Sequence, residues 1–189
     1  MYHKILKTPS FHALFVYIDG KLADKTRSED CPSCGGPLYQ ADYPRSPLGL
    51  PVSCREYYDS RHSFCCGDCR KRVTTPSVRF FGRRRFPAVI MLLISAFMSS
   101  GSRRRYYQVK RYFGINISLR TWVRWRRWWL ECFIGTAFWK HAKAHLPLTA
   151  LAGLFPRQLI LIYPGRLNEQ LEKALQFLAP LTAGVYRAV

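Results

Sequence analysis

Four cysteines are arranged in two pairs that suit metal binding. Cys31 and Cys34 form one CxxC motif, Cys66 and Cys69 form a second, and residues 35–65 lie between them. Each motif folds into a tight turn that directs two thiolates at one ion, and two such turns complete the tetrahedral shell that Zn²⁺ prefers. Because cysteine fills all four positions, none remains for a catalytic water. We therefore predict one structural zinc ion.

The residues around these motifs favour the same site and leave some alternatives open. Gly35 and Gly36 allow the backbone to bend around the sulfurs, and the basic run 70–72 favours ionised thiols. The separation of the pairs exceeds the usual spacing of about 15–20 residues, so a Pro-rich insertion over 43–51 must be accommodated. Three nearby side chains compete as ligands: Cys65, Cys54 and His62. We expect the remaining cysteine, Cys132, to be a core thiol.

Positive charge is concentrated in the middle of the chain. The 189 residues carry a net charge of +19, and residues 70–130 contain sixteen Lys and Arg with no Asp or Glu, whereas residues 1–69 contain eight of each kind. A surface of one sign attracts polyanions and binds them in a salt-dependent manner. The expected partner is nucleic acid.

Within this basic stretch, residues 108–125 have the layout of a DNA-binding helix-turn-helix. A helix over 103–113 would end at Gly114, a turn would follow, and Ser118 would cap a third helix running to about Trp139. Because successive helical residues are rotated by about 100°, Arg120, Arg124 and Arg127 fall on one narrow face. These arginines, with Thr121 early in the helix, could contact phosphates or guanine edges in the major groove.

Other residues of this region have simpler expected roles. Two arginine triplets flank the motif and should contact phosphates: Arg83, Arg84 and Arg85, and Arg103, Arg104 and Arg105. We expect the aromatic side of the third helix to face the core through Trp122, Trp125, Trp129 and Phe133, with the position of Trp128 undecided.

The overall prediction is an α+β chain, mainly α, with a small zinc ribbon followed by a helical domain. Residues 1–27 would pack on the ribbon as a strand or a short helix, and 28–82 would form the zinc ribbon. Residues 83–140 would form the basic helix-turn-helix domain, with a buried helix from Pro87 to about Met98. Residues 141–189 would be a helical extension with short helices over 148–154, 156–162 and 167–178.

No segment has the features of a membrane or export signal. The N-terminal apolar run is short and broken by Asp19, with no small-residue cleavage site. The most apolar segment, residues 88–98, has eleven residues and is too short to cross a bilayer. We expect a cytoplasmic, nucleoid-associated protein that does not contact membranes.

Three runs of the sequence resemble one group of proteins: CPSCGGPLYQADYPRSP, SFCCGDCRKRVTTPSVRFFGRR and GINISLRTWVRWRRWW. They are similar to small bacterial transposase-type zinc-ribbon and helix-turn-helix proteins of mobile elements. The resemblance covers roughly residues 28–140. It implies that the four CxxC cysteines are the ligands, and that the chain binds DNA at transposon or integrase-linked sites.

The acidic residues do not support catalysis. A metal-dependent transposase or nuclease needs clustered carboxylates, yet only Glu131, Glu169 and Glu172 follow Asp68. We therefore expect a zinc-stabilised protein that binds double-stranded DNA and has no catalytic activity of its own. Its role would be that of a transcription regulator, or of an accessory or targeting factor whose partner is a transposase or recombinase. The alternatives are an RNA-binding or ribonucleoprotein-assembly protein and an inactive transposase relic.

Overall fold

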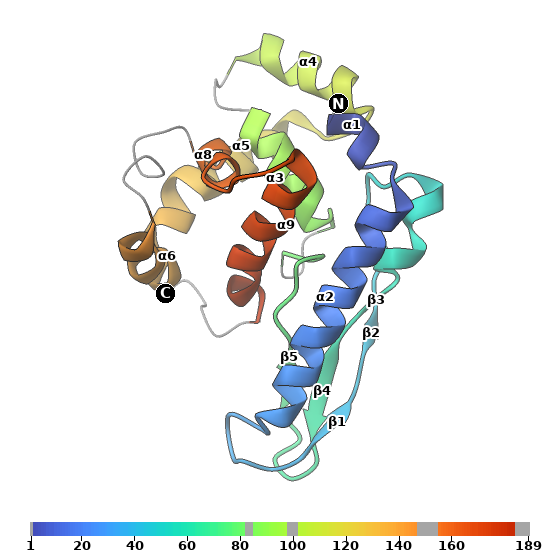
Figure 1. The fold of residues 1–189 in the computed structure, drawn as a ribbon, viewed down its shortest axis with the longest axis vertical. Helices are drawn as coiled ribbons and strands as arrows, with labels where there is room; N and C mark the ends of the chain where they lie inside the picture. Colours follow the sequence, from blue (N-terminus) through green and yellow to red (C-terminus); the bar gives the residue numbers. More distant parts are fainter. Residues whose placement is uncertain (1, 82–84, 98–101, 147–154, 184–189) are drawn as a thin grey trace.

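A computed structural model describes residues 2–81, 85–97, 102–146 and 155–183. A long N-terminal helix lies beside a small set of strands, and the remaining helices gather against its other end (Figure 1). The chain is therefore α+β and mainly helical, which confirms the predicted fold class at this level. We call the five strands and the two cysteine turns the ribbon, and the helices from residue 88 onward the helical lobe.

The elements follow one another in a simple order along the chain. The N-terminal part and the ribbon contain α1 (Tyr2–Ile5), α2 (Pro9–Ser28), β1 (Leu38–Gln40), β2 (Tyr43–Pro44), η1 (Val52–Cys54), η2 (Glu56–Tyr58), β3 (Ser60–Arg61), β4 (Ser63–Cys66) and β5 (Arg72–Thr74). The helical lobe contains α3 (Ala88–Phe97), α4 (Arg103–Phe113), α5 (Leu119–Arg127), η3 (Trp128–Phe133), α6 (Ala137–Ala142), η4 (Lys143–His145), α8 (Arg157–Leu161), α9 (Leu167–Leu178) and η5 (Ala179–Thr182).

Helix α2 is much longer than the strand or short helix that the sequence suggested. It begins at Pro9, whose fixed φ suits the first turn, and its 20 residues run past Asp19 and Gly20 to Ser28. Asp19 does not interrupt the helix because its carboxylate is buried and accepts hydrogen bonds of 2.7 Å from the Ser77 hydroxyl, the Val78 N–H and Arg79 Nε. The helix therefore contacts both the ribbon and the chain that leads into the helical lobe.

The ribbon consists of two small antiparallel sheets. Strands β1, β4 and β5 form the larger sheet in the order β1-β4-β5, with Leu38 opposite Cys66, and β2 pairs with β3. The strands are short, and few apolar side chains are buried there: Ala23 of α2 packs with Leu38, Phe64, Cys31 and Cys66. Burial of so little apolar surface leaves such a module dependent on another source of stability.

The helical lobe is built around α3. Residues 88–96 are all buried, and α3 packs against α5, α8 and α9. This confirms the predicted buried helix, which the structure describes over Ala88–Phe97. The same hydrophobic cluster extends from Leu6 to Ala179 and includes Phe15 of α2. Among the described residues, none of the helices combines the length and the apolar character needed to cross a membrane.

The third helix of the basic region differs from its predicted course. Its α-helical part ends at Arg127, a π-helical turn follows over Trp128–Phe133, and Thr136 caps a new helix by accepting a hydrogen bond from the Trp139 N–H. The expectation of one helix to Trp139 was therefore wrong, because the Thr136 hydroxyl offers the backbone another partner. Cys132 lies on this turn and is exposed, which corrects its predicted burial.

The aromatic residues of this region lie where the sequence predicted. Trp122, Trp125, Trp129 and Phe133 are all buried, whereas Trp128 is half-buried. Helix α9 has the predicted bounds, and α8 lies within the predicted range 156–162. The predicted helix over 148–154 lies outside the described residues.

Candidate metal centre and basic surface

The two CxxC segments form matching turns. In the first, the N–H of Cys31 donates a hydrogen bond of 3.0 Å to the carbonyl of Gly36. In the second, the N–H of Cys66 donates one of 3.0 Å to the carbonyl of Lys71. The chain thus closes on itself over the same number of residues in both turns, so the two cysteine pairs are presented in the same way.

A left-handed residue completes each turn directly after its second cysteine. Gly35 has φ 73° and Arg70 has φ 58°. Position 36 also favours glycine, because the Cβ of any other residue would overlap the side chain of Asp68 from the other turn. The glycines therefore allow one turn to bend and the two turns to approach each other.

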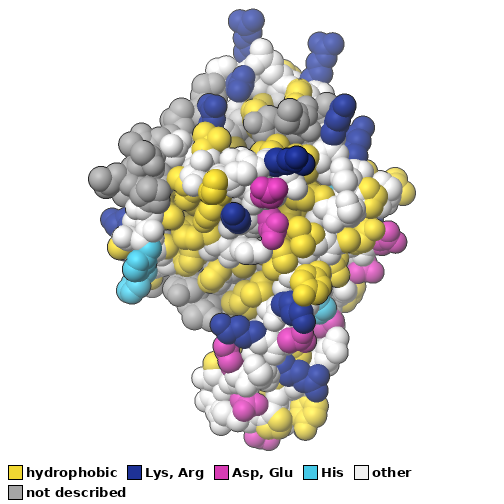
Figure 2. All heavy atoms as spheres, viewed as in Figure 1, with side chains coloured by type: hydrophobic (Ala, Val, Ile, Leu, Met, Phe, Trp, Pro, Cys, Tyr) yellow, Lys and Arg dark blue, Asp and Glu magenta, His cyan; other side chains and the backbone are white. Residues whose placement is uncertain are grey.

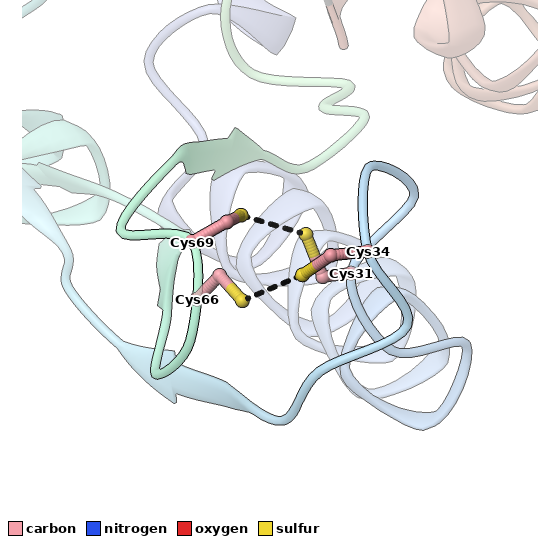
Figure 3. A group of neighbouring side chains, drawn as sticks. All are labelled: Cys31, Cys34, Cys66 and Cys69. Atoms are coloured by element: carbon pink, nitrogen blue, oxygen red, sulfur yellow. Dashed lines mark hydrogen bonds between the residues drawn. The ribbon is translucent and has the colours of Figure 1, made fainter.

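The four sulfurs face one another between the turns (Figure 3). All lie within 4.8 Å of one another, with 3.7 Å between the Sγ atoms of Cys31 and Cys69 and 3.4 Å between those of Cys34 and Cys66. A tetrahedral shell with metal–sulfur bonds of about 2.3 Å places its sulfurs about 3.8 Å apart, whereas a disulfide requires about 2.05 Å. The spacing fits four thiolates around one metal ion.

The competing ligands lie apart from this cluster. Cys65 is directed toward the carbonyl of Arg70, 3.6 Å from its sulfur, and Cys54 is buried at η1. His62 contacts the Asp42 carboxylate through Nδ1 at 3.1 Å. Over the described part of the chain, the four CxxC cysteines form the one group of three or more potential ligands that could hold an ion.

The surroundings shift the pKa values of Cys31 and Cys34 in opposite directions. The backbone N–H of Ser33 is the main cause that lowers the pKa of the Cys31 thiol to about 7. The N–H of Gly36 favours the thiolate of Cys34, but the neighbouring thiols, Cys69 first, raise the pKa of Cys34 to about 12. The surroundings therefore favour ionisation of Cys31 over that of Cys34, and binding of a metal cation would favour the thiolate form.

Helix α4 has the predicted bounds and C-terminal glycine, and α5 begins at the predicted residue with the predicted serine cap. Gly114 ends α4 in the left-handed conformation, with φ 65°, and its N–H donates to the carbonyl of Lys110 over 3.0 Å. Ser118 caps α5 by accepting a hydrogen bond of 3.1 Å from the N–H of Thr121. The Ser118 hydroxyl also donates to the Thr121 hydroxyl over 3.0 Å, which holds that side chain against the cap.

A buried tyrosine connects the two helices. The Tyr106 hydroxyl of α4 donates a hydrogen bond of 2.6 Å to the carbonyl of Ile117, just before α5. Its ring packs edge-on against Trp122 of α5, with 5.2 Å between the ring centroids. The two helices are therefore held together by both a polar and an aromatic contact, while their outer faces remain exposed.

The outward face of α5 is a shallow hollow made by arginine and aliphatic side chains. Its lining residues are Leu119, Arg120, Val123, Arg124 and Arg127. The structure thus brings together the three arginines that the sequence placed on one face. Sequence reasoning missed Leu119 and Val123, although their spacing of one turn was visible beside the arginines.

The three arginines of the hollow differ in their partners. Arg127 Nε lies 2.7 Å from a Glu131 carboxylate oxygen, and both side chains are largely exposed. Arg120 and Arg124 are exposed and form no ion pair with any described residue. Within the hollow, Arg120 and Arg124 are therefore the arginines without an acidic partner among the described residues.

The arginines of the two flanking triplets also differ in exposure and in hydrogen bonding. Arg83 and Arg84 lie outside the described residues, and Arg85 is exposed. Arg103 and Arg104 are exposed at the start of α4, whereas Arg105 Nε donates to the carbonyl of Phe97 over 3.0 Å. Lys and Arg side chains project from the end of the molecule that carries α4, and most acidic side chains lie farther down (Figure 2).

Comparisons with protein-family models, with curated proteins and with solved structures find no match to this chain.

Proposed function

We propose that the chain is a zinc-stabilised protein that binds double-stranded DNA and has no catalytic activity of its own. One observation carries the proposal: Arg120 and Arg124 lie on an exposed face of a capped helix, without acidic partners among the described residues. In this proposal α4 and α5 form a helix-turn-helix. The α5 face enters the major groove, where arginine binds guanine O6 and N7.

The zinc ion has a structural role in this proposal. Four cysteine ligands close a tetrahedral shell, so no position is left for water or substrate. The ion compensates for the few apolar side chains that the ribbon buries, and it holds β1 and β4 near the C-terminal end of α2.

The distribution of acids supports a binding role over catalysis. In the whole chain, the acids after residue 68 are Glu131, Glu169 and Glu172. Glu131 is paired with Arg127, and Glu169 accepts a hydrogen bond from the Arg166 N–H at the start of α9. Two-metal nucleic-acid chemistry needs a carboxylate cluster that these positions do not supply.

At the level of the cell, the proposed role is that of a transcription regulator, or of an accessory or targeting factor of a bacterial mobile element. In the second case a transposase or recombinase is its partner, and in both cases it acts on DNA in the cytoplasm. The concentration of charge in residues 70–130, with sixteen Lys and Arg and no acid, supports the DNA partner.

A second candidate, RNA binding, is favoured by one exposed side chain. Tyr107 of α4 is 65% exposed and lies one turn from both Arg103 and Arg111. An exposed aromatic ring between arginines is suited to stacking on an unpaired base. Structured RNA is therefore the competitor to include in every binding measurement.

Matched arginine substitutions test the main proposal. The duplex is first selected from a random pool, and its affinity is then measured for Arg124→Ala and Arg120→Ala. Each should weaken binding to the selected duplex by about 1–3 kcal/mol and relax specificity at one position. The control is Arg126→Ala, because Arg126 is exposed on the same helix but does not line the hollow. If Arg126→Ala and Arg124→Ala lose the same affinity for the selected duplex, the proposal that the hollow side of α5 contacts bases in the major groove is contradicted.

The nucleic-acid class is tested separately. Selected duplex and a folded RNA hairpin compete for the protein at several salt concentrations. Duplex should win at each, with an affinity that falls as salt rises. If the hairpin wins throughout, the RNA candidate replaces the DNA proposal.

A further inference from the structure

The hollow on α5 contains two aliphatic side chains that arginine-phosphate binding does not require. Val123 is 56% exposed and Leu119 is 36% exposed. They lie one helical turn apart, beside Arg120 and Arg124 in the same hollow. Together they form an apolar strip between positive charges.

Packing and helix formation do not explain this strip. The core side of α5 is already formed by Trp122 and Trp125, which are buried. Valine is a weaker helix former than alanine, because its branched side chain loses rotamer freedom in a helix. The strip therefore has the character of a contact surface for something outside the described chain.

We propose that Val123, supported by Leu119, contacts the C5-methyl group of a thymine in the major groove. This inference rests on the proposed duplex-DNA function and makes Val123 a specificity-determining residue. Among the four bases of DNA, thymine alone carries a methyl group in the major groove, and apolar side chains recognise it there. The flanking arginines would bind guanine, so the arginine–guanine and valine–thymine contacts fall at neighbouring base pairs.

The helix geometry sets the spacing of these positions. Arg120 and Arg124 lie about 6 Å apart along the helix axis, since each residue rises about 1.5 Å. Neighbouring bases of one strand lie about 3.4 Å apart. The two arginines therefore span about two base-pair steps, and Val123 lies between them. The preferred site should contain a thymine within one or two base pairs of a guanine.

Charge argues against a second copy of the chain as the occupant of the hollow. A symmetric dimer would place the same patch on both partners. Arg120 and Arg124 of each copy would then face like charges, whereas a polyanion compensates them. Nucleic acid is thus the occupant that matches both parts of the hollow.

Removing the methyl group from the DNA tests the proposal. Each thymine of the selected duplex is replaced in turn by deoxyuridine, which keeps the base pair and lacks the methyl. We expect one replacement to weaken binding of the unsubstituted protein by about three- to five-fold, as the loss of one buried carbon implies. Val123→Ala should bind the thymine and deoxyuridine duplexes equally.

The control variant is Leu130→Ala, because Leu130 is exposed but lies outside the hollow. It should retain the preference for thymine. If no replacement changes the affinity, or if Val123→Ala keeps the preference, the thymine contact is disproved while duplex binding stands. If no duplex binds at all, the proposed function fails, which is a different result.

Discussion

Arg70 occupies in the second cysteine turn the place that Gly35 occupies in the first, and both residues have positive φ, 58° and 73°. Each follows the second cysteine of its pair. The left-handed conformation costs an ordinary residue about 1–2 kcal/mol, and glycine avoids this cost. The second turn therefore carries backbone strain that the first does not.

This difference predicts opposite effects of two substitutions. Gly35→Ala should lower the free energy of unfolding by about 1 kcal/mol, because no atom lies within 4 Å of the added Cβ and the cost is conformational. Arg70→Gly should leave the stability unchanged or raise it by up to about 1 kcal/mol, since relief of strain is partly offset by unfolded-state entropy. Urea unfolding of the metal-loaded protein measures both. A destabilising Arg70→Gly would indicate that the arginine side chain has another role.

Metal content should depend on the cluster cysteines alone. We expect one zinc per chain by native mass spectrometry, and Cys34→Ser should lose most of it. Cys34 is exposed, so its substitution does not disturb packing. Cys65→Ser is the matched control, because Cys65 is adjacent to a ligand and directed away from the cluster. Loss of zinc from Cys65→Ser would show that the ligand set is different.

The buried pair of Asp19 and Arg79 should be a large contributor to stability. Asp19→Asn leaves the Arg79 charge buried without its counter-ion, and such a change costs about 3–5 kcal/mol. Chemical denaturation measures the effect. Asp24→Asn removes a charge from an exposed position of the same helix and should change the stability by less than about 0.5 kcal/mol. Similar results for the two variants would mean that the pair contributes little.

His12 should make the protein less stable in mild acid. Its Nε2 lies 3.0 Å from the Leu6 carbonyl, which can only accept, so Nε2 carries the proton and the Tyr58 hydroxyl donates to Nδ1 over 2.9 Å. Burial lowers the pKa of His12 below its ordinary value of 6.5. The unfolded chain therefore binds a proton that the folded chain does not. The free energy of unfolding should fall as pH decreases below about 6.5.

The contribution of His12 is isolated by comparison of variants. His12→Gln should have a smaller pH slope between about pH 5 and 7, since it cannot titrate there. His145→Gln alters an exposed histidine and should keep the original slope. Identical slopes for His12→Gln and the unsubstituted protein would assign the acid sensitivity to other groups.

Glu131 should weaken the attraction of α5 for DNA. Its carboxylate is paired with Arg127 at the edge of the hollow, so Glu131→Gln leaves that arginine without a counter-charge. We expect duplex affinity to rise by about two- to five-fold at low salt and the gain to shrink at high salt, because the groups are exposed and screened. Glu56→Gln removes the same charge from η2 and should have no effect. An equal gain from both would reflect net charge alone.

The parts of the fold that local chemistry determines could be predicted from the sequence. Gly114 ends α4 and Ser118 begins α5 as the sequence predicts, and the CxxC motifs bring the four thiols together. Helix α2 was missed because the partner that neutralises Asp19 lies 60 residues away. The break at Thr136 depended on whether one hydroxyl bonds to the backbone. Leu119 and Val123 were missed because apolar residues in a helix are ordinarily assigned to the core.

Helix α2 belongs to both hydrophobic clusters, and this determines how far local unfolding can spread. Phe11 and Phe15 pack into the large cluster, Ala23 packs into the small one, and Asp19 lies between them with its three hydrogen bonds. We expect release of the proposed zinc ion to loosen the last turns of α2 together with the ribbon. Asp19 contacts residues 77–79, which lead into the helical lobe, and we expect these contacts to persist. In the proposed zinc-bound protein, we therefore expect metal occupancy to decide whether the ribbon is folded and to leave α5 folded in either case.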